Sequence, residues 1–351
     1  MNQAPALEGE PLRAVEHRGS HVQIIASAGS GKTEVVSQRV VSLLAEGVSA
    51  REIVAFTFTE RAAKELKFRI ATRLQQRLGL EAVDQLSGLY VGTIHGYCFQ
   101  FLQQLVPRYE TFDVLDESQH VAFLCREASH LNLKSLVPGN KLFEAIDLFN
   151  KSVQVLENEL LDPASMPEPF KSVIKTYLSS LDKYRLLTFG QQIVRSVAAL
   201  EDPAVATEIH KSLKHLIVDE YQDVNPAQEE LIRRLVSGGA FLTVVGDDDQ
   251  AIYQWRGSTV SNIIAFTKRY NGVQTFMLDI NRRSLPDIIT TAARFSLTIN
   301  DRLDKEMKPW RATKDGHGEE QIVSWACDTE QDEAVEIARL IANLNASGLP
   351  Y

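Results

Sequence analysis

The strongest chemical signal in the sequence is a turn of small residues that ends in a lysine and a threonine. An apolar run, Val22–Ala26, leads into it, and a helical pattern from Thr33 to Ala45 follows. Glycines in such a turn let consecutive backbone N–H groups converge on phosphate oxygens, and the helix N-terminus adds a favourable dipole. Lys32 would reach the terminal phosphates of a nucleotide, and the Thr33 hydroxyl would bind Mg²⁺. The predicted phosphate-binding residues are Ala26, Ser27, Ala28, Gly29, Ser30, Gly31, Lys32 and Thr33.

A second apolar run ends in two carboxylates and supplies the acidic partner that such a turn needs. Leu216, Ile217 and Val218 precede Asp219 and Glu220. We expect Asp219 to hold Mg²⁺ through its water shell. Glu220 would orient and deprotonate the attacking water. Together the two segments predict a P-loop site for nucleotide hydrolysis.

Five longer stretches make the prediction more specific. The segment DEYQDVN (Asp219–Asn225), taken with VVGDDDQAIYQWRGS (Val244–Ser258), strongly resembles the UvrD/Rep/PcrA family of superfamily 1 helicases. Further matches follow the family's motif order: AFTFTERAAKEL (Ala55–Leu66), VGTIHGYC (Val91–Cys98) and Ile280–Ser284. The resemblance spans residues 7 to 284.

The resemblance implies two RecA-like domains that clamp ATP and Mg²⁺ between them. It also implies ATP-driven 3′ to 5′ movement along single-stranded DNA, with unwinding of the duplex ahead. Gln250 matches the residue that senses the γ-phosphate. Arg283 matches an arginine that reaches across from the second domain to stabilise charge in the transition state.

The expected DNA contacts combine aromatic and polar residues. Tyr253 and Trp255 stand two apart beside the acidic run, and aromatic faces stack on bases without reading sequence. A basic segment, residues 61 to 78, holds six Lys or Arg against one Glu, and its predicted helix start would favour a phosphate. The predicted DNA-binding residues are Phe58, Thr59, Arg61, Thr93, His95, Tyr253, Trp255 and Arg256.

Three departures from the family pattern concern the nucleotide base. Pro11 stands where the family has an adenine-reading Gln, Glu34 replaces an Arg after the P-loop threonine, and Arg282 replaces the aromatic of the fourth motif. We expect Arg282 to stack over the base, as part of the ATP site, and to pair with Glu34. Selectivity for the base would then be loose.

The elements that must position these residues alternate between β-rich runs and helical patterns, which predicts an α/β fold with a parallel sheet. The expected strands are Val22–Ala26, Ile53–Thr57, Leu89–Thr93, Leu216–Asp219, Phe241–Val245 and Gln321–Cys327. The expected helices include Thr33–Ala45, Arg61–Leu78, Asn225–Val236 and Thr329–Ala346.

Together with these elements, the resemblance implies a P-loop NTPase with a RecA-like sheet, a helical insertion and an incomplete second RecA-like domain. The first domain would comprise residues 1–112 and 186–277. The insertion would be 113–185, and the second domain would begin at 278 and continue to 351. Nothing resembling the family's fifth and sixth motifs follows Ser284, so we expect residues 1–351 alone to hydrolyse ATP slowly.

Composition sets the remaining limits. The net charge is −9, and eight acids without a Lys or Arg lie between Asp315 and Glu336, so the rest of the chain is close to neutral and does not exclude nucleic acid. Three scattered cysteines argue against disulfides and structural zinc. No apolar run approaches ~18 residues, which predicts no membrane span. A cytoplasmic enzyme is expected.

The expected partners are single-stranded DNA and duplex junctions, with a nuclease domain or a second helicase subunit as further candidates. Two alternatives stay open. One is a nucleotide-gated single-strand binding or regulatory module that does not unwind DNA. The other is an unrelated P-loop enzyme such as a small-molecule kinase, which would not need the Tyr253–Trp255 stacking pair.

Overall fold

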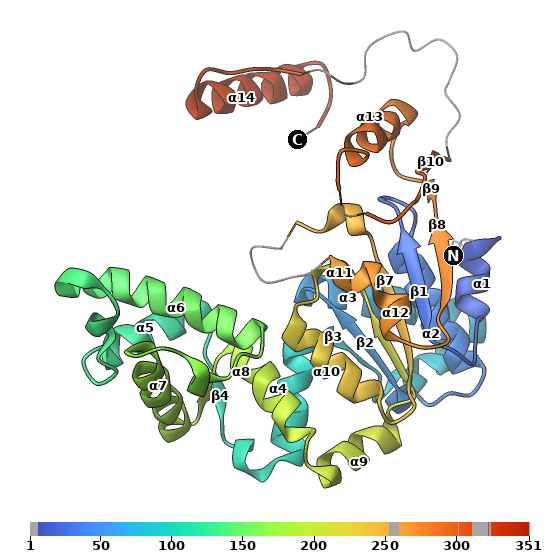
Figure 1. Ribbon diagram of the computed structural model, residues 1–351. Helices are drawn as coiled ribbons and strands as arrows, with labels where there is room; N and C mark the ends of the chain where they lie inside the picture. The colour runs from blue at the N-terminus through green and yellow to red at the C-terminus, as the bar shows by residue number, and fades with distance from the viewer. Residues whose placement is uncertain (1–5, 253–259, 301, 311–321, 323, 351) are drawn as a thin grey trace.

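A parallel β-sheet forms the centre of the molecule. The computed structural model describes residues 6–252, 260–300, 302–310, 322 and 324–350. Six strands pair in the order β3-β2-β6-β7-β1-β8, and every pairing is parallel (Figure 1). Their bounds are β1 Val22–Ala26, β2 Ile53–Thr57, β3 Tyr90–Thr93, β6 His215–Val218, β7 Phe241–Gly246 and β8 Gln274–Leu278.

Helices cover both faces of the sheet. Because successive side chains of a strand point to opposite faces, each strand contributes to two cores. Ile24 belongs to one hydrophobic core and Ile25 to the other. The first core packs against α1 Glu10–Glu16, α2 Lys32–Ala45 and α3 Glu60–Leu78. The second packs against α4 Ile94–Leu105, α8 Phe189–Ala199, α9 Pro203–Ser212 and α10 Pro226–Val236. Two short helices, α11 Ser261–Ile264 and α12 Phe266–Arg269, complete the second face.

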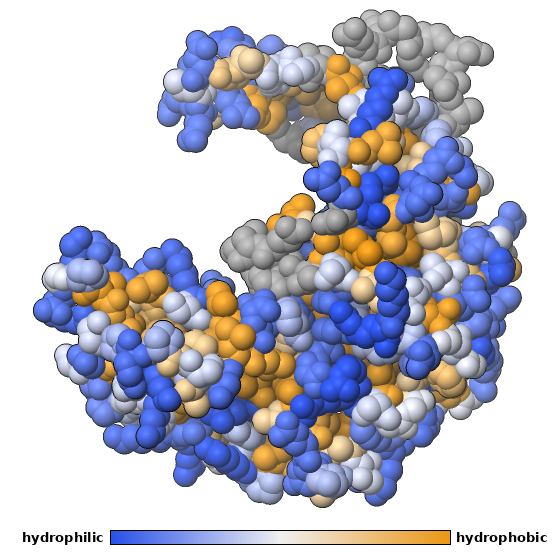
Figure 2. Space-filling model, viewed as in Figure 1, coloured by the Kyte–Doolittle hydropathy of each residue, from blue (hydrophilic) through white to orange (hydrophobic). Residues whose placement is uncertain are grey.

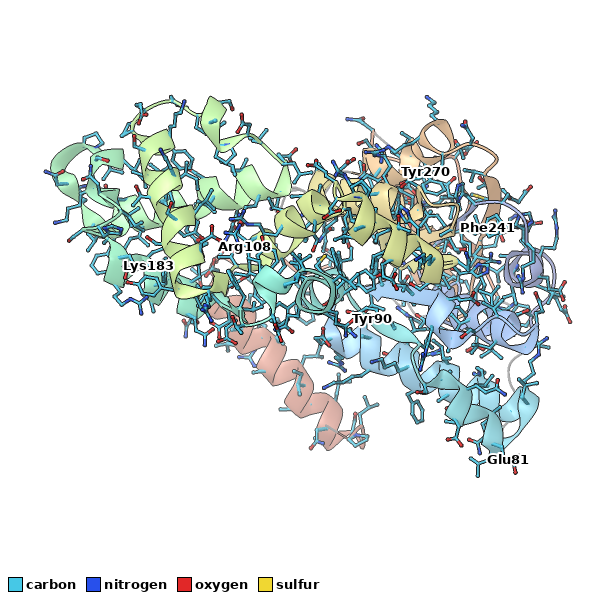
Figure 3. All side chains as sticks on the ribbon, turned by 90° about the horizontal axis from the view of Figure 1, so that it is seen from below. Glu81, Tyr90, Arg108, Lys183, Phe241 and Tyr270 are labelled. Atoms are coloured by element: carbon cyan, nitrogen blue, oxygen red, sulfur yellow. The ribbon has the colours of Figure 1, made fainter. Side chains whose placement is uncertain are left out.

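The chain between α4 and α8 leaves this sheet and forms a separate set of helices. These are α5 Glu117–Glu127, α6 Leu142–Asn158 and α7 Phe170–Tyr184. They bury a third hydrophobic core of their own around Phe149 and Tyr177. A short parallel pair, β4 Asp113–Val114 with β5 Leu186–Leu187, closes the excursion where it begins and ends. Figure 3 shows Arg108 and Lys183 toward these inserted helices, with Phe241 and Tyr270 at the far end of the sheet.

After β8 the chain forms small elements beyond the sheet. These are β9 Ile280–Asn281, α13 Pro286–Ser296, β10 Lys308–Pro309 and α14 Glu330–Ala346, and β9 pairs with β10. Figure 2 shows the molecule hollowed between the inserted helices at lower left and α14 at upper left. Among the described residues, no helix is long and apolar enough to cross a membrane.

The structure agrees with most predicted elements and corrects two. The five strands predicted before residue 250 match the observed ones to within a residue at each end, and the four helices do so as well. The predicted strand Gln321–Cys327 is wrong where it is described: residues 322 and 324–327 form no strand and are exposed, so no neighbouring strand satisfies their backbone groups. Conversely, β8 was not predicted, although it pairs with β1 along five residues.

Candidate nucleotide and nucleic-acid site

The predicted phosphate turn lies between the carboxyl end of β1 and the start of α2. Gly29 and Gly31 take the left-handed backbone conformation, with φ of 67° and 93°, which side chains disfavour. Helix α2 then begins at Lys32, directly after Gly31. The buried Ser30 hydroxyl has no hydrogen-bond partner among the described residues. A left-handed glycine turn with a partnerless buried hydroxyl at a helix start fits a phosphate group.

The two predicted acids lie beside this turn, at the carboxyl end of β6. The Nζ of Lys32 donates a hydrogen bond of 3.0 Å to Oε2 of Glu220, which joins residues 188 positions apart in the chain. Glu220 itself has a left-handed backbone, with φ of 51° and ψ of 45°. That conformation is uncommon for a non-glycine residue and often marks a functional position. The backbone N–H of Glu220 donates to the Asp219 carboxylate at 3.0 Å.

Excess negative charge gathers at the same place. Burial, reinforced by the charge of Glu220, raises the pKa of Asp219 to about 6 and that of Asp223 to about 6. Lys32 offsets this only in part. Buried carboxylates with raised pKa values beside a phosphate turn fit a divalent cation, which would favour their ionised forms. Among the described residues no cluster of three or more His, Cys, Asp or Glu forms a metal cage. Mg²⁺ shared with a nucleotide needs only one or two carboxylates.

A chain of hydrogen bonds links Glu220 to the loop after β7. Gln222 donates from Nε2 to Oε2 of Glu220 at 2.9 Å, and its Oε1 accepts from the backbone N–H of Asp247 at 3.0 Å. Asp247 in turn accepts from the side-chain amide of Gln250. Gly246 makes room for this link, since a Cβ there would come within 2.5 Å of the Gln222 oxygen. Gln250 is thus connected to Lys32 through three intervening residues, Asp247, Gln222 and Glu220.

The predicted ion pair between Glu34 and Arg282 is not formed. Glu34 accepts two hydrogen bonds from Arg73, at 2.8 and 3.0 Å, and another from Gln38 at 2.7 Å. Arg69 approaches the same carboxylate at 3.6 Å. Helix α3 therefore neutralises Glu34, because it packs beside α2. The guanidinium of Arg282 lies instead over the ring of Trp310, 4.1 Å from its centroid.

The segment around β9 contacts the phosphate turn directly. The backbone N–H of Arg282 donates to the Gly29 carbonyl at 2.9 Å. A Cβ at Gly29 would come within 2.8 Å of the Asn281 side chain and 2.9 Å of Arg283. The backbone of Arg283 is held by the Asn281 carboxamide at 2.9 Å, while its side chain is exposed. Arg283 is therefore adjacent to the turn that would hold the phosphates.

Four predicted DNA-contact residues gather at the carboxyl ends of β2 and β3. The Thr59 hydroxyl accepts from the N–H of Ala62, and the Thr93 hydroxyl accepts from that of Gly96, each at 3.1 Å. Both threonines thus cap helices, a role that sequence analysis did not assign. Phe58 is exposed beside them. Burial lowers the pKa of His95 to about 4, so its ring is neutral at pH 7. The ring lies edge-on to that of Phe189, with 5.6 Å between the ring centroids.

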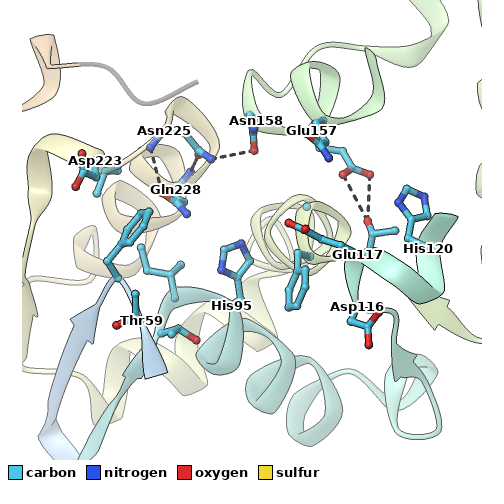
Figure 4. Close-up of a pocket in the computed structure, with 18 of the residues that line it drawn as sticks. Thr59, His95, Asp116, Glu117, His120, Glu157, Asn158, Asp223, Asn225 and Gln228 are labelled. Carbon is cyan, nitrogen blue, oxygen red and sulfur yellow. Dashed lines mark hydrogen bonds between the residues drawn. The ribbon is translucent and has the colours of Figure 1, made fainter. Parts of the chain in front are cut away.

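A cavity of about 790 Å³ separates these residues from the inserted helices. Figure 4 shows Thr59 and His95 on its sheet side, with Glu117, His120 and Glu157 on the opposite side. Arg61 is exposed at the start of α3, two residues after Thr59, which lines the cavity. The predicted contacts Tyr253, Trp255 and Arg256 lie outside the described residues.

The cavity also contains a buried acid that sequence analysis missed. Glu157, at the end of α6, is 3 % exposed and accepts a hydrogen bond of 2.7 Å from Gln191 of α8. The Thr188 hydroxyl lies 3.4 Å from both of its carboxylate oxygens. A Cβ at Gly190 would come within 2.0 Å of the carboxylate. Residues 188–191 therefore join the inserted helices to α8, which packs on one face of the sheet.

Comparison with known proteins gives one consistent result. The UvrD/REP helicase N-terminal domain matches residues 7–271. The ATP-dependent DNA helicase UvrD1 of Mycobacterium leprae is 32% identical over 372 residues, covering 97% of this chain and 45% of the relative. The ATP-dependent DNA helicase PcrA of Staphylococcus aureus is 31% identical over 355 residues, covering 97% and 46%. The chain thus spans about half the length of these curated relatives.

Proposed function

This chain belongs to the UvrD/REP helicase family, and from that premise we propose that it is the ATP-binding part of a DNA translocase. In this proposal, residues 1–112 and 186–277 form the first RecA-like domain, 113–185 are its helical insertion, and a second RecA-like domain begins at 278. ATP hydrolysis would drive 3′ to 5′ movement on single-stranded DNA and unwinding of duplex junctions. The observation that carries the proposal is the convergence of Lys32, Glu220 and Gln250 in one hydrogen-bonded network beside the phosphate turn.

The residues of this site divide the chemistry among them. The backbone from Ala26 to Gly31 would hold the β-phosphate, with Lys32 turning from Glu220 toward the terminal phosphates. This movement of Lys32 would release the Glu220 carboxylate to accept the proton of the attacking water. Thr33 and Asp219 would hold Mg²⁺, which neutralises phosphate charge when bound. Gln250 would sense the terminal phosphate.

The second half of the proposed site comes from the segment after β8. Arg283 is held next to Gly29 by the Asn281 carboxamide. A guanidinium at that position would stabilise the charge that develops on the transferred phosphoryl group. Arg282, stacked on Trp310, would cover the nucleotide base without reading its edge.

The DNA path in this proposal crosses the carboxyl ends of β2 and β3. Exposed Phe58 would stack on a base, and the start of α3 with Arg61 would meet a phosphate. Thr93 and the neutral His95 would contact the strand along the cavity edge. Tyr253, Trp255 and Arg256, which the resemblance assigns to DNA contact, would belong to the same path.

A steady-state ATPase assay with and without single-stranded oligonucleotide tests the proposal, beside a forked-duplex unwinding assay. For residues 1–351 alone we expect slow Mg·ATP turnover that DNA accelerates only weakly and that Lys32→Ala abolishes, and no unwinding of the duplex. Arg18→Ala is a suitable control, because Arg18 pairs with Glu46 away from the phosphate turn. Turnover that survives Lys32→Ala would refute the assignment. Nucleotide-dependent DNA binding without any ATP turnover would favour a regulatory binding module.

A further inference from the structure

Three consecutive acids follow β7, and two cations from a distant part of the chain neutralise them. Asp247, Asp248 and Asp249 form the loop that leads to Gln250. The side chains of Asp247 and Asp248 are 2 % and 0 % exposed. Three adjacent carboxylates, two of them buried, repel one another, so the loop needs positive charge to keep this shape.

That charge comes from the segment between α13 and β10. The ammonium of Lys305, 4 % exposed, contacts Asp247 and Asp248 directly and lies 3.3 Å from Asp249. Burial alone would lower the pKa of Lys305, but the attraction of Asp247 and Asp248 outweighs it and raises the pKa. The lysine therefore stays charged in a nearly water-free site.

Two further bonds fix the same segment on the loop. Arg302 donates from Nε and Nη2 to the two oxygens of Asp249, at 3.0 and 3.1 Å. The backbone N–H of Leu303 donates to Asp248 at 2.6 Å. A bidentate guanidinium and a backbone donor set orientation as well as charge. Residues 302 to 305 thus dock on the acidic loop in a single register.

The contact on Asp247 extends into the nucleotide site. One oxygen of Asp247 accepts from Lys305, and the other accepts from the Gln250 amide. The backbone N–H of Asp247 donates to Gln222, which leads on to Glu220. Without Lys305, the Oδ1 of Asp247 would keep only the long hydrogen bond of 3.3 Å from the backbone N–H of Asp249. Asp247 could then rotate, and Gln250 would lose its fixed acceptor.

We propose that Lys305, supported by Arg302, is a positioning residue that orients Gln250 toward the terminal phosphate of the nucleotide through Asp247. The inference rests on the proposed function, and it makes the readiness of the phosphate sensor depend on docking of the chain after β8. Arg283 belongs to that same part of the chain. One docking event would therefore set both the sensor and the arginine.

The test measures binding of two fluorescent nucleotides, ADP and a non-hydrolysable ATP analogue, to the full chain with Mg²⁺. The ratio of their dissociation constants reports how strongly the protein senses the γ-phosphate. We expect Lys305→Met to lower the preference for the ATP analogue about tenfold, equivalent to about 1.4 kcal/mol, and we expect Gln250→Ala to have the same effect. The double variant should be no worse than either single one, because the two residues act in series.

Two further variants separate positioning from folding. Lys308→Met is the matched control. Lys308 follows Lys305 by three residues, but its side chain is 52% exposed and pairs with Asp279. The ratio of dissociation constants for this variant should equal that of the wild type. Asp248→Asn/Lys305→Met removes one acid with the lysine, so the group of three acids and two cations keeps its net charge of −1. This double variant should fold and still lose the preference for the ATP analogue over ADP. The separate variant Lys305→Arg should retain part of that preference.

Three results would overturn the proposal. One is a folded Lys305→Met or Asp248→Asn/Lys305→Met variant that keeps the wild-type ratio of dissociation constants. Another is an equal loss of affinity for both nucleotides, which would indicate a structural role. Failure of the wild type to bind either nucleotide would refute the proposed function itself, and that failure is distinguishable because it precedes any substitution.

Discussion

The buried carboxyl of Glu157 makes the attachment of the inserted helices sensitive to pH. Burial raises its pKa to about 7, and the hydrogen bonds from Gln191 and Thr188 offset this only in part. In the unfolded chain the group would have its ordinary value of 4.5. The folded protein therefore binds a proton that the unfolded chain releases between about pH 4.5 and 7. Stability falls as pH rises through that window, and the loss is complete above it.

The size of this effect follows from the difference between about 7 and 4.5, which is about 2.5. At about 1.36 kcal/mol for each factor of ten in proton affinity, ionised Glu157 costs about 3 kcal/mol at pH 8. Glu157→Gln removes the ionisation and keeps an oxygen that can accept from Gln191. We expect the variant to gain about 3 kcal/mol relative to the wild type on going from pH 4.5 to pH 8.

Urea unfolding at a series of pH values measures the gain, and hydrogen exchange of the α6 and α8 amides locates it. The control is Glu159→Gln, because Glu159 is exposed two residues further along. Its difference from the wild type should not vary with pH in this window. A Glu157→Gln difference that is the same at pH 4.5 and pH 8 would refute the reasoning, whatever its sign.

Three other substitutions test separate parts of the site. Glu220→Gln should keep nucleotide binding and lose turnover in the ATPase assay, because an amide cannot take the proton of water; equal loss of binding would make Glu220 structural. Arg61→Ala should reduce the slope of log K against log salt for single-stranded DNA by about one, whereas an unchanged slope would place the phosphate path elsewhere. Arg73→Ala should lower stability in urea unfolding by about 2 kcal/mol, because Glu34 is buried and keeps only its weaker partners; no loss would contradict the ion pair.

The sequence predicted most of the central sheet because its strands carry local signals. β1, β2, β6 and β7 are nearly continuous apolar runs, as expected for strands buried on both faces. The edge strand β8 has only Phe276 and Leu278 buried, so its signal is a short alternation among polar residues. An edge strand buries less surface, and its sequence is correspondingly less distinctive.

The phosphate turn was predictable for the same reason, since eight neighbouring residues form it. The pairing of Glu34 was not, because helix packing decides which cation reaches it. Arg73 and Arg69 lie one turn apart on α3, facing α2, and Arg282 is directed to Trp310 instead. The prediction joined two unusual residues by charge alone and ignored the closer cations on the neighbouring helix.

The acidic loop shows how part of this long-range information was nevertheless present in the sequence. Asp247, Asp248 and Asp249 directly follow an apolar strand, and the structure buries the first two of them at its end. Buried carboxylates without cations are costly, and that requirement alone predicts a basic partner from another segment. The sequence does not identify the partner, because β8, β9 and α13 separate Arg302 and Lys305 from the loop along the chain. In the proposed function, Gln250 would acquire its orientation toward the terminal phosphate only when the chain after β8 has docked on the three acids that precede it.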